Sequence, residues 1–302
     1  KPARLFFPMQ KTFNSVLIQW YHRHAREIAW RSPDTSAWGI LLSEVMSQQT
    51  PVARVEPKWQ EWINRWPTPC ALAKAPTDQV LRAWDRLGYP RRALRLKECA
   101  EVICSQFDGA VPQNLNDLLA LPGIGEYTAR AIAAFAFGQR VPVVDTNVRR
   151  VYYRACVGRF LAPGQAATRK ELAAVLELMP TEQAPEFAVA LMELGATVCL
   201  TSPNCDSCPL KDEFCAWQEA GCPQPTAEEL AAKKKRVQKF TGTDRQVRGI
   251  IMAKLRESTT PVPQSGIDVL WPDAEQRRRA LFSLLEDGLA VHDRQGYSLP
   301  VR

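Results

Sequence analysis

The chain has 302 residues, 46% of them hydrophobic, and a formal net charge of +7 at pH 7. This length can bury a large core and predicts two domains, with room for a third small one. The positive charge favours a polyanionic partner. No apolar run approaches the roughly 18 residues of a membrane span, and no signal-peptide core is found, so we expect a cytoplasmic protein without a membrane partner.

Apolar residues recur at helical spacing through residues 1–220, whereas strand patterns are nearly absent there. Pro or Gly separates most of the helical segments. The predicted helices cover residues 12–28, 38–49, 52–65, 77–86, 92–106, 114–120, 126–137, 168–178 and 181–196, the last capped by Thr181. The sequence therefore predicts an all-α body larger than a four-helix bundle.

The stretch 121–151 joins a glycine turn to a carboxylate. Leu121 opens a Leu-Pro-Gly-Ile-Gly turn whose glycines are Gly123 and Gly125. Backbone amides of such a turn at a helix N-terminus can bind a phosphate. Asp145 follows about 20 residues later, where another helix begins, an arrangement typical of DNA-handling proteins. A plain connecting turn and a simple helix cap remain the alternatives.

Four cysteines stand close together in the sequence. The four are Cys199, Cys205, Cys208 and Cys215, with five, two and six residues between consecutive cysteines. Closing such short loops costs little entropy, so all four thiols can reach one centre. Without an export signal we expect thiol ligands instead of disulfides, which indicates zinc or an iron–sulfur cluster. The other cysteines are expected to pack as small apolar side chains: Cys70, Cys99, Cys104, Cys156 and Cys222.

The composition changes after residue 222. Residues 223–240 form a proline-containing basic linker with the run Lys233-Lys234-Lys235-Arg236. Beyond it, helical patterns at 244–257 and 273–287 precede a hairpin pattern that starts at Gly288. We therefore predict a small winged-helix-like domain over 241–302, which would add phosphate contacts; a packing or protein-binding surface is the alternative.

Three segments carry a resemblance to a known family. The octapeptide Ser-Glu-Val-Met-Ser-Gln-Gln-Thr at 43–50 differs only at Ser47 from the signature of MutY-type adenine DNA glycosylases. The segment 26–31 resembles their Pro-Trp-Arg segment with Ala29 for proline, and Gly88-Tyr89 resembles part of Gly-Leu-Gly-Tyr-Tyr. The resemblance covers about 12–220 and implies the helix–hairpin–helix (HhH-GPD) glycosylase fold in residues 1–222. In that fold a six-helix barrel spans about 36–150, and about 1–35 and 151–222 form a cluster domain.

The resemblance implies a monofunctional, monomeric enzyme of base excision repair that removes adenine opposite 8-oxoguanine or guanine from double-stranded DNA. With it comes the expectation of a bacterial, nucleoid-associated protein. Glu44 would protonate N7 of adenine if apolar surroundings keep its carboxyl group protonated. Asp145 would stabilise the oxocarbenium ion of the sugar. Asn147 would orient a carboxylate. Tyr127 would hydrogen-bond near the sugar, at the position where bifunctional relatives resembling endonuclease III carry a nucleophilic lysine.

The remaining implied sites are contacts to DNA and to a cofactor. The DNA or base contacts are Arg26, Trp30, Arg31, Gln48, Gln49, Tyr89, Leu121, Gly123 and Gly125. Among them, Gln49 and Tyr89 match the family's intercalating positions. The cysteine loop implies a [4Fe–4S] cluster, although the family's usual separations are six, two and five residues, and its loop presents basic residues that are missing here.

Three features depart from the family pattern. Thr146 replaces a glycine, Val189 replaces a Glu or Gln that faces the adenine, and the residues after Thr241 are too few for the family's Nudix-like domain. Two other functions therefore stay open: a glycosylase for another base, such as thymine opposite G, and a non-catalytic iron–sulfur DNA-binding protein. Glu44 favours a purine substrate, because a pyrimidine has no N7 to protonate. The presence of both carboxylates weighs against a function in binding alone.

Overall fold

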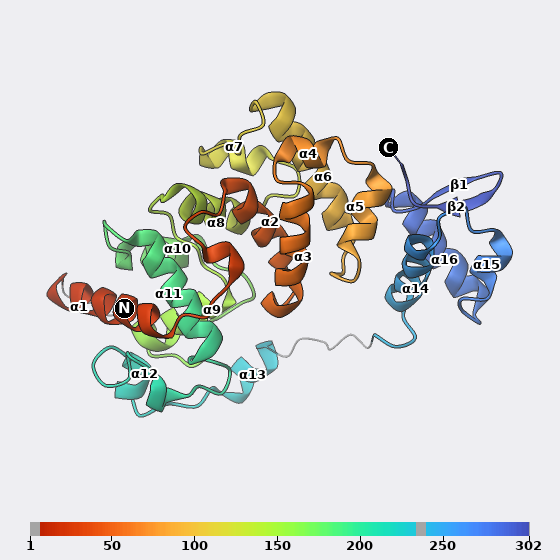
Figure 1. Ribbon diagram of the computed structural model, residues 1–302. Coiled ribbons are helices and arrows are strands. Elements are labelled where there is room, and N and C mark those ends of the chain that lie inside the picture. Colours follow the sequence, from red (N-terminus) through yellow and green to blue (C-terminus); the bar gives the residue numbers. More distant parts are fainter. Residues whose placement is uncertain (1–6, 234–239, 302) are drawn as a thin grey trace. The chain divides into compact units, whose positions relative to one another are not determined.

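The computed structural model describes residues 7–233 and 240–301, which form helices α1 to α16, short helical turns η1 to η3 and one two-stranded sheet (Figure 1). The predicted mainly helical fold is confirmed. Within the described ranges, no helix is long and apolar enough to cross a membrane.

The described residues form two compact units. Unit 1 contains residues up to Arg31 and those from Gly125 to Lys233. Its elements are α1 (Phe7–His24), η1 (Ala29–Arg31), α8 (Glu126–Phe137), α9 (Thr146–Tyr152), η2 (Tyr153–Val157), α10 (Arg169–Leu178), α11 (Ala184–Thr197), η3 (Cys205–Ser207), α12 (Ala216–Glu219) and α13 (Ala227–Lys233).

Unit 2 contains residues Ser32 to Ile124 together with those from Phe240 onward. Its elements are α2 (Ala37–Ser47), α3 (Val52–Arg65), α4 (Pro69–Ala73), α5 (Thr77–Trp84), α6 (Arg91–Gln106), α7 (Leu115–Ala120), α14 (Asp244–Glu257), α15 (Gln264–Asp268), α16 (Ala274–Glu286), β1 (Val291–Asp293) and β2 (Gly296–Ser298).

The core of unit 1 forms where α11 packs against α1 and α9. The Phe13 ring lies 6.2 Å from the Phe187 ring and 5.9 Å from the Phe214 ring, between centroids. At the α9–α11 contact, a Cβ added to Gly195 would lie 2.7 Å from the backbone oxygen of Asn147. Only glycine permits this approach, which packs the start of α9 closely against α11.

Tryptophans dominate the core of unit 2. The rings of Trp62 and Trp84, on α3 and α5, lie 5.5 Å apart between centroids. Trp59 donates a hydrogen bond from Nε1 to the backbone oxygen of Gly39 at 2.8 Å, where α2 and α3 approach. Because a buried indole N–H needs an acceptor, this bond fixes α2 relative to α3.

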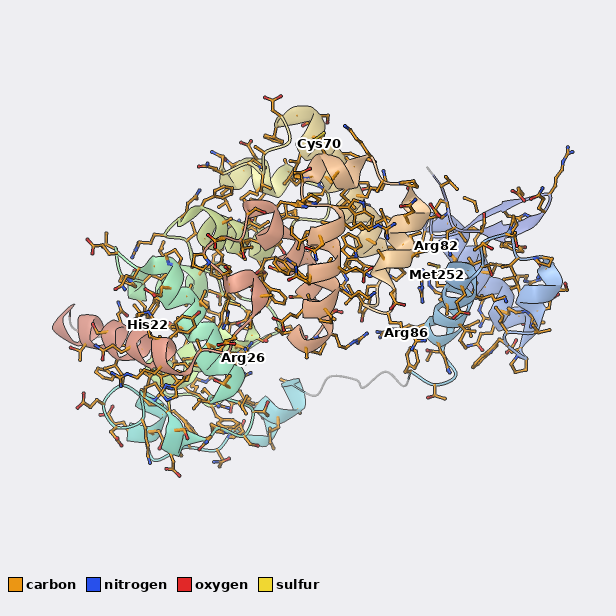
Figure 2. All side chains as sticks on the ribbon, viewed as in Figure 1. His22, Arg26, Cys70, Arg82, Arg86 and Met252 are labelled. Atoms are coloured by element: carbon orange, nitrogen blue, oxygen red, sulfur yellow. A yellow bond between two sulfur atoms is a disulfide. The ribbon has the colours of Figure 1, made fainter. Side chains whose placement is uncertain are left out.

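The C-terminal residues of unit 2 pack on α5. Arg82 of α5 donates hydrogen bonds to the backbone oxygens of Arg256 and, at 2.8 Å, of Ser258 (Figure 2). The Thr77 amide also donates to the Val301 oxygen at 3.2 Å. The predicted hairpin is present, with β1 and β2 pairing antiparallel.

Three predicted helix ends were wrong by three or more residues. Helix α1 begins at Phe7, five residues before the predicted start, and ends at His24, four residues before the predicted end. Helix α11 begins at Ala184, because Gln183 adopts a left-handed conformation (φ 59°), so Thr181 does not cap it. By contrast, Thr168 forms a reciprocal capping box with Glu171 at the start of α10.

The expectation of unbonded, packed thiols was wrong for Cys70 and Cys104. Their sulfur atoms are bonded at 2.04 Å across 34 residues of sequence. Helices α4 and α6 pack side by side, which brings Cys70 (Figure 2) and Cys104 together. Cys99 and Cys156 are buried free thiols, as expected, and burial raises the pKa of each to about 12.

Candidate active site and cysteine pocket

Asp145 is the N-cap of α9. Its Oδ1 accepts a hydrogen bond from the Val148 amide at 2.7 Å, and its Oδ2 accepts one from Asn147 Nδ2 at 2.8 Å. Burial raises the pKa of Asp145, while these two hydrogen bonds and the nearby Arg150 guanidinium act in the opposite direction. The carboxylate is therefore fixed in orientation and is harder to ionise than an exposed aspartate.

Arg150 connects the Asp145 region to the cysteine loop. Its Nη2 donates to Asn147 Oδ1 at 2.7 Å and to the Gly195 oxygen at 2.6 Å, while its Nε donates to the Cys199 backbone oxygen. Asn147 thus bonds Asp145 with its nitrogen and Arg150 with its oxygen. The sequence did not predict this role of Arg150, because two of its three acceptors, Gly195 and Cys199, are 45 and 49 residues away in sequence.

The glycine turn joins α7 to α8. Leu121 is the C-cap of α7, and Gly125 is the N-cap of α8. Gly123 has φ of 77°, and a Cβ there would lie 2.9 Å from the Arg95 Cβ. Gly125 has no heavy atom within 4 Å of an added Cβ, so its backbone is open to a ligand. Tyr127 lies half-buried in the first turn of α8.

Glu44 lies in the second half of α2, a helix capped by the Ser36 side chain. Its neighbours Ser43, Val45 and Met46 are buried, whereas Glu44 itself is half-buried. The predicted position of Glu44 on a largely apolar helix is therefore observed. The structure describes Glu44 within unit 2 and Asp145 within unit 1.

One guanidinium organises the segments that carry the predicted intercalating residues. Arg92 donates to the backbone oxygens of Val45 at 3.0 Å, Met46 at 3.1 Å and Gln48 at 2.6 Å. It also donates to the oxygens of Leu87 at 3.2 Å and Gly88 at 3.1 Å. The end of α2 and the loop before α6 are therefore tied together.

Burial lowers the pKa of Arg92 to about 10. In the two segments that Arg92 joins, Gln49 and Tyr89 have positive φ values of 56° and 47°. Such conformations are strained for residues with a side chain and are frequent at functional sites. No sequence pattern separates Arg92 from Arg91 beside it.

Arg26 and Arg31 converge on a glutamate that sequence reasoning missed. Glu193 of α11 is fully buried and accepts hydrogen bonds from Arg26 Nε and Arg31 Nη2, each at 2.7 Å. Although burial alone would raise it, these hydrogen bonds lower the pKa of Glu193 to about 2. Trp30 lies half-buried in η1 between the two arginines in sequence, and Val189 lies half-buried on α11. Glu193 is the one charged residue in the apolar second half of the predicted helix 181–196, and this was the available signal.

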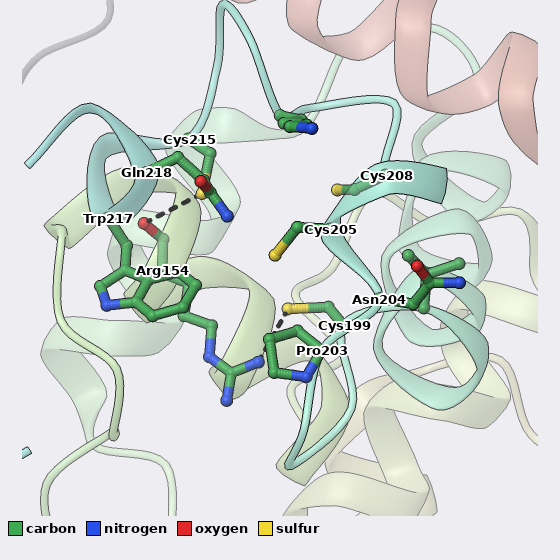
Figure 3. A pocket seen from close by; sticks show the side chains of 11 residues that line it. Arg154, Cys199, Pro203, Asn204, Cys205, Cys208, Cys215, Trp217 and Gln218 are labelled. Atoms are coloured by element: carbon green, nitrogen blue, oxygen red, sulfur yellow. Dashed lines mark hydrogen bonds between the residues drawn. The ribbon is translucent and has the colours of Figure 1, made fainter. Parts of the chain in front are cut away.

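The four cysteines of the loop line one pocket, shown in Figure 3. Arg154, only 2% exposed, donates to the Cys199 sulfur at 3.4 Å and to the Leu200 oxygen at 2.6 Å. Burial raises the pKa of the Cys208 thiol to about 12, so metal binding there would release a proton. Among the described residues, no group of three or more His, Cys, Asp or Glu side chains has an arrangement that could hold a metal ion.

The predicted site residues divide between the units. Unit 1 brings together Arg26 and Arg31 through Glu193, and Asp145 and Asn147 through their hydrogen bond. Unit 2 brings together the Gln48 and Tyr89 segments through Arg92. Tyr127 and the cysteines also belong to unit 1, whereas Glu44, Leu121 and Gly123 belong to unit 2.

Residues 42–177 match the HhH-GPD superfamily of base excision DNA repair proteins. The adenine DNA glycosylase of Mycolicibacterium smegmatis is 54% identical over 283 residues, 93% of this chain and 93% of the relative. A thermostable thymine-DNA glycosylase is similar in structure, with a TM-score of 0.64 and 26% identity over 70% of this chain and 97% of that one. Endonuclease III, trapped on DNA, shares the fold with a TM-score of 0.58 and 22% identity over 71% of this chain and 99% of that one. The chain therefore belongs to the adenine DNA glycosylase family within the HhH-GPD superfamily of base excision DNA repair proteins.

Proposed function

We propose that this protein removes adenine that is mispaired with 8-oxoguanine or guanine in double-stranded DNA, by hydrolysing its N-glycosidic bond. The observation that carries the proposal is the Asp145 carboxylate, fixed at the N-terminus of α9 by Val148 and Asn147. The 54% identity to an adenine DNA glycosylase over nearly the whole chain supports adenine as the base. The similarity to a thymine-DNA glycosylase structure rests on 26% identity and supports thymine less well.

Glu44 acts as the general acid in the proposed reaction. Its proton passes to N7 of adenine, so the base departs as a neutral molecule when the glycosidic bond breaks. The bonding electrons leave with the base, and the sugar carries the positive charge. Glu44 is half-buried on a largely apolar helix, and partial burial suits a carboxyl group that must be protonated at neutral pH.

Asp145 stabilises the oxocarbenium ion electrostatically or through a transient covalent bond. This carboxylate must be ionised while Glu44 is protonated, which is the division of roles in glycoside hydrolysis. Asn147 keeps the Asp145 oxygens in a fixed direction through its 2.8 Å hydrogen bond. Water then adds to the anomeric carbon and loses a proton, and an abasic site remains.

Tyr127 makes the proposed enzyme monofunctional. A lyase reaction needs an amine that attacks the sugar to form a Schiff base, and a phenol cannot form one. The Tyr127 hydroxyl can hydrogen-bond near the sugar instead.

The DNA contacts follow from the turns and cations already described. The backbone of Gly125 at the start of α8 suits a phosphate, since helix N-terminal amides attract anions. Gln49 and Tyr89 would fill the space that the extruded adenine leaves. Arg26 and Arg31, held by Glu193, would line the base pocket.

The cysteine pocket would hold a [4Fe–4S] cluster on Cys199, Cys205, Cys208 and Cys215. Four thiols that line one pocket match this group in donor type and number, although in the described residues they are not drawn together in a metal-binding arrangement. The cluster would cross-link the loop. Arg150 would hold this loop next to Asn147, because it donates hydrogen bonds to both the Cys199 backbone oxygen and Asn147 Oδ1.

The proposal is tested by single-turnover incubation with duplexes that contain A:8-oxoG, A:G, T:G or A:T pairs, followed by alkaline cleavage. We expect cleavage of the A:8-oxoG and A:G duplexes at the adenine position only. Glu44→Gln and Asp145→Asn should each slow the reaction by at least ~10²-fold. Glu61→Gln changes an exposed carboxylate of α3 and should react like the wild type. Cleavage of T:G alone would establish the thymine-specific function, and binding without cleavage of any duplex would refute the enzymatic function.

A further inference from the structure

Tyr89 stands at an exposed surface made by two distant parts of unit 2. The Tyr89 side chain is 45% exposed, and that of Phe240 is 55% exposed. Arg245, the second residue of α14, lies between them. Its guanidinium carbon is 4.8 Å from the centre of the Tyr89 ring and 5.8 Å from that of the Phe240 ring. We name Tyr89, Phe240 and Arg245 the Tyr89 surface.

Two guanidinium groups lie close to the Tyr89 ring. Arg92, which fixes the loop before α6, lies with its guanidinium carbon 5.7 Å from the centre of the same ring. Cations over an aromatic face are attracted by its quadrupole and restrict the motion of the ring. Tyr89 also has a positive φ of 47°, so its backbone and its ring are both held in an unusual position.

Contacts to the end of α14 and to the end of α16 hold the C-terminal residues beside the Tyr89 loop. Arg82 binds the oxygens of Arg256 and Ser258 at the C-terminal end of α14. Arg91, two residues after Tyr89, forms an ion pair of 3.3 Å with Asp287, just after α16. These contacts keep Arg245 in place over the ring.

The charge of Arg245 is available to a ligand. Among the residues that the structure describes, Arg245 is exposed and makes no ion pair, whereas Arg248 of the same helix is paired with Asp287 at 2.6 Å. Two exposed aromatic rings beside such a guanidinium suit nucleobases and the phosphates next to them, because bases stack on aromatic faces and phosphates bind arginine.

We propose that the C-terminal residues complete the intercalating element of the enzyme: Arg245 positions Tyr89, and the Tyr89 surface binds double-stranded DNA at the step where the base pair opens. The inference rests on the proposed function and extends it. It assigns the C-terminal part of the chain to mismatch engagement, beyond the sequence-independent phosphate contacts that the sequence predicted. Arg245 acts through Tyr89 and is a positioning residue.

A double-mutant cycle in the full-length protein tests the link between the two side chains. The dissociation constants of wild type, Tyr89→Ala, Arg245→Ala and the double variant are measured with an A:8-oxoG duplex and with a matched duplex. The same proteins are compared by the fluorescence of 2-aminopurine placed beside the target adenine. Each single change should weaken mismatch binding by about 5–10-fold and reduce the fluorescence rise. The double variant should bind no more weakly than Tyr89→Ala alone, because the two side chains act together.

Two variants separate positioning from simple charge. Arg278→Ala removes an equally positive but 77% exposed side chain from α16, and it should keep the wild-type ratio of mismatched to matched affinity. Arg245→Lys keeps the charge but not the planar face, so it should retain matched-duplex affinity and recover only part of the mismatch preference. Additive losses in the cycle, equal losses on both duplexes with Arg245→Ala, or full recovery with Arg245→Lys would each overturn the inference.

Failure of the inference about Arg245 can be distinguished from failure of the proposed adenine-removing function. If the wild type releases adenine from A:8-oxoG while the cycle is additive, only the inference about Arg245 fails. If the cycle shows coupling but no adenine is released, the proposed activity fails and the DNA contact remains.

Discussion

Asn147 donates a hydrogen bond of 2.8 Å from Nδ2 to the Oδ2 atom of Asp145, two residues before it at the start of α9. A hydrogen bond donated to a carboxylate stabilises its ionised form and therefore lowers its pKa. Burial of Asp145 acts more strongly in the other direction, so its pKa is raised. The ionised fraction of the proposed catalytic carboxylate depends on this balance.

Asn147→Ala should move the acidic limb of the pH–rate profile to higher pH. The variant loses a bond that favours the carboxylate, so the pKa of Asp145 rises further and protonation begins sooner as the pH falls. The alkaline limb should not move, because it reports loss of the proton from the proposed acid Glu44, whereas the substitution removes a bond to Asp145. Single-turnover adenine release between about pH 4 and about pH 8 measures both limbs. Asn116→Ala, an exposed change on α7, is the control, and an unchanged acidic limb in Asn147→Ala would contradict the role of this bond.

Gly195→Ala should damage both stability and activity. The added Cβ would lie 2.7 Å from the Asn147 backbone oxygen, so α9 or α11 must shift. We expect a loss of about 1–3 kcal/mol in the free energy of unfolding, with slower adenine release. Gly249→Ala in α14 is the matched control, since nothing lies within 4 Å of its added Cβ. Replacing that helical glycine should stabilise by about 0.5–1 kcal/mol. Urea unfolding measures the free energy of unfolding of both variants. A loss in Gly195→Ala beside a gain in Gly249→Ala would show that the close approach to Asn147 outweighs the higher helix propensity of alanine.

Glu193→Gln should destabilise unit 1 most strongly at neutral pH. The fully buried carboxylate pairs with Arg26 and Arg31, and removing one partner of a buried pair costs about 3–5 kcal/mol. Because the Arg26 side chain is 43% exposed, solvent screens that pair, and we expect the lower end of this range.

The stabilisation by Glu193 depends on pH with a definite sign. Its pKa is lowered from 4.5 to about 2 in the folded protein, so its contribution is fully present above about pH 4.5 and is lost as the pH falls toward 2. The difference in unfolding free energy between wild type and Glu193→Gln should therefore shrink across this window. Glu186→Gln, whose partner is the half-exposed His22, is the control and should show a small difference. If the difference in unfolding free energy between wild type and Glu193→Gln stayed constant down to about pH 2, the lowered pKa of Glu193 would be contradicted.

Local patterns in the sequence predicted the residues whose roles are set by local structure. Asp145 is a helix cap because a rigid apolar segment precedes it and a helix follows, and both signals lie within a few residues. Gly123 and Gly125 form a turn for the same reason. The first five residues of the octapeptide, which include Glu44, lie on the predicted helix, since their apolar neighbours repeat at helical spacing.

Contacts between distant segments were not predictable in this way. Glu193 pairs with Arg26 across 167 residues, and Arg92 binds α2 across more than 40 residues. Cys70 and Cys104 form a disulfide because α4 packs on α6, which no spacing rule indicates. The position of Arg245 over Tyr89 likewise depends on how α14 packs against α5. In each case one partner alone gives no sign of the other.

The wild-type protein should leave abasic sites intact. Tyr127 occupies the start of α8 where a lyase would need an amine, so borohydride should trap no covalent complex with an abasic duplex. Denaturing gel electrophoresis after borohydride treatment measures this directly, and Tyr127→Lys serves as the comparison that offers an amine at the same position. Efficient trapping of the wild type would show that another amine performs lyase chemistry.

Loss of one cysteine of the pocket should remove the proposed cluster. Protein purified anaerobically should be yellow-brown and contain about four irons per chain. Cys205→Ser replaces one thiol that lines the pocket, so iron content and soluble yield should both fall. Cys222→Ser is the matched control, because Cys222 is a free cysteine just beyond the loop that does not line the pocket, and it should keep the full iron content. Stoichiometric zinc without iron, in protein made with adequate iron supply, would contradict the cluster and identify the site as a zinc site.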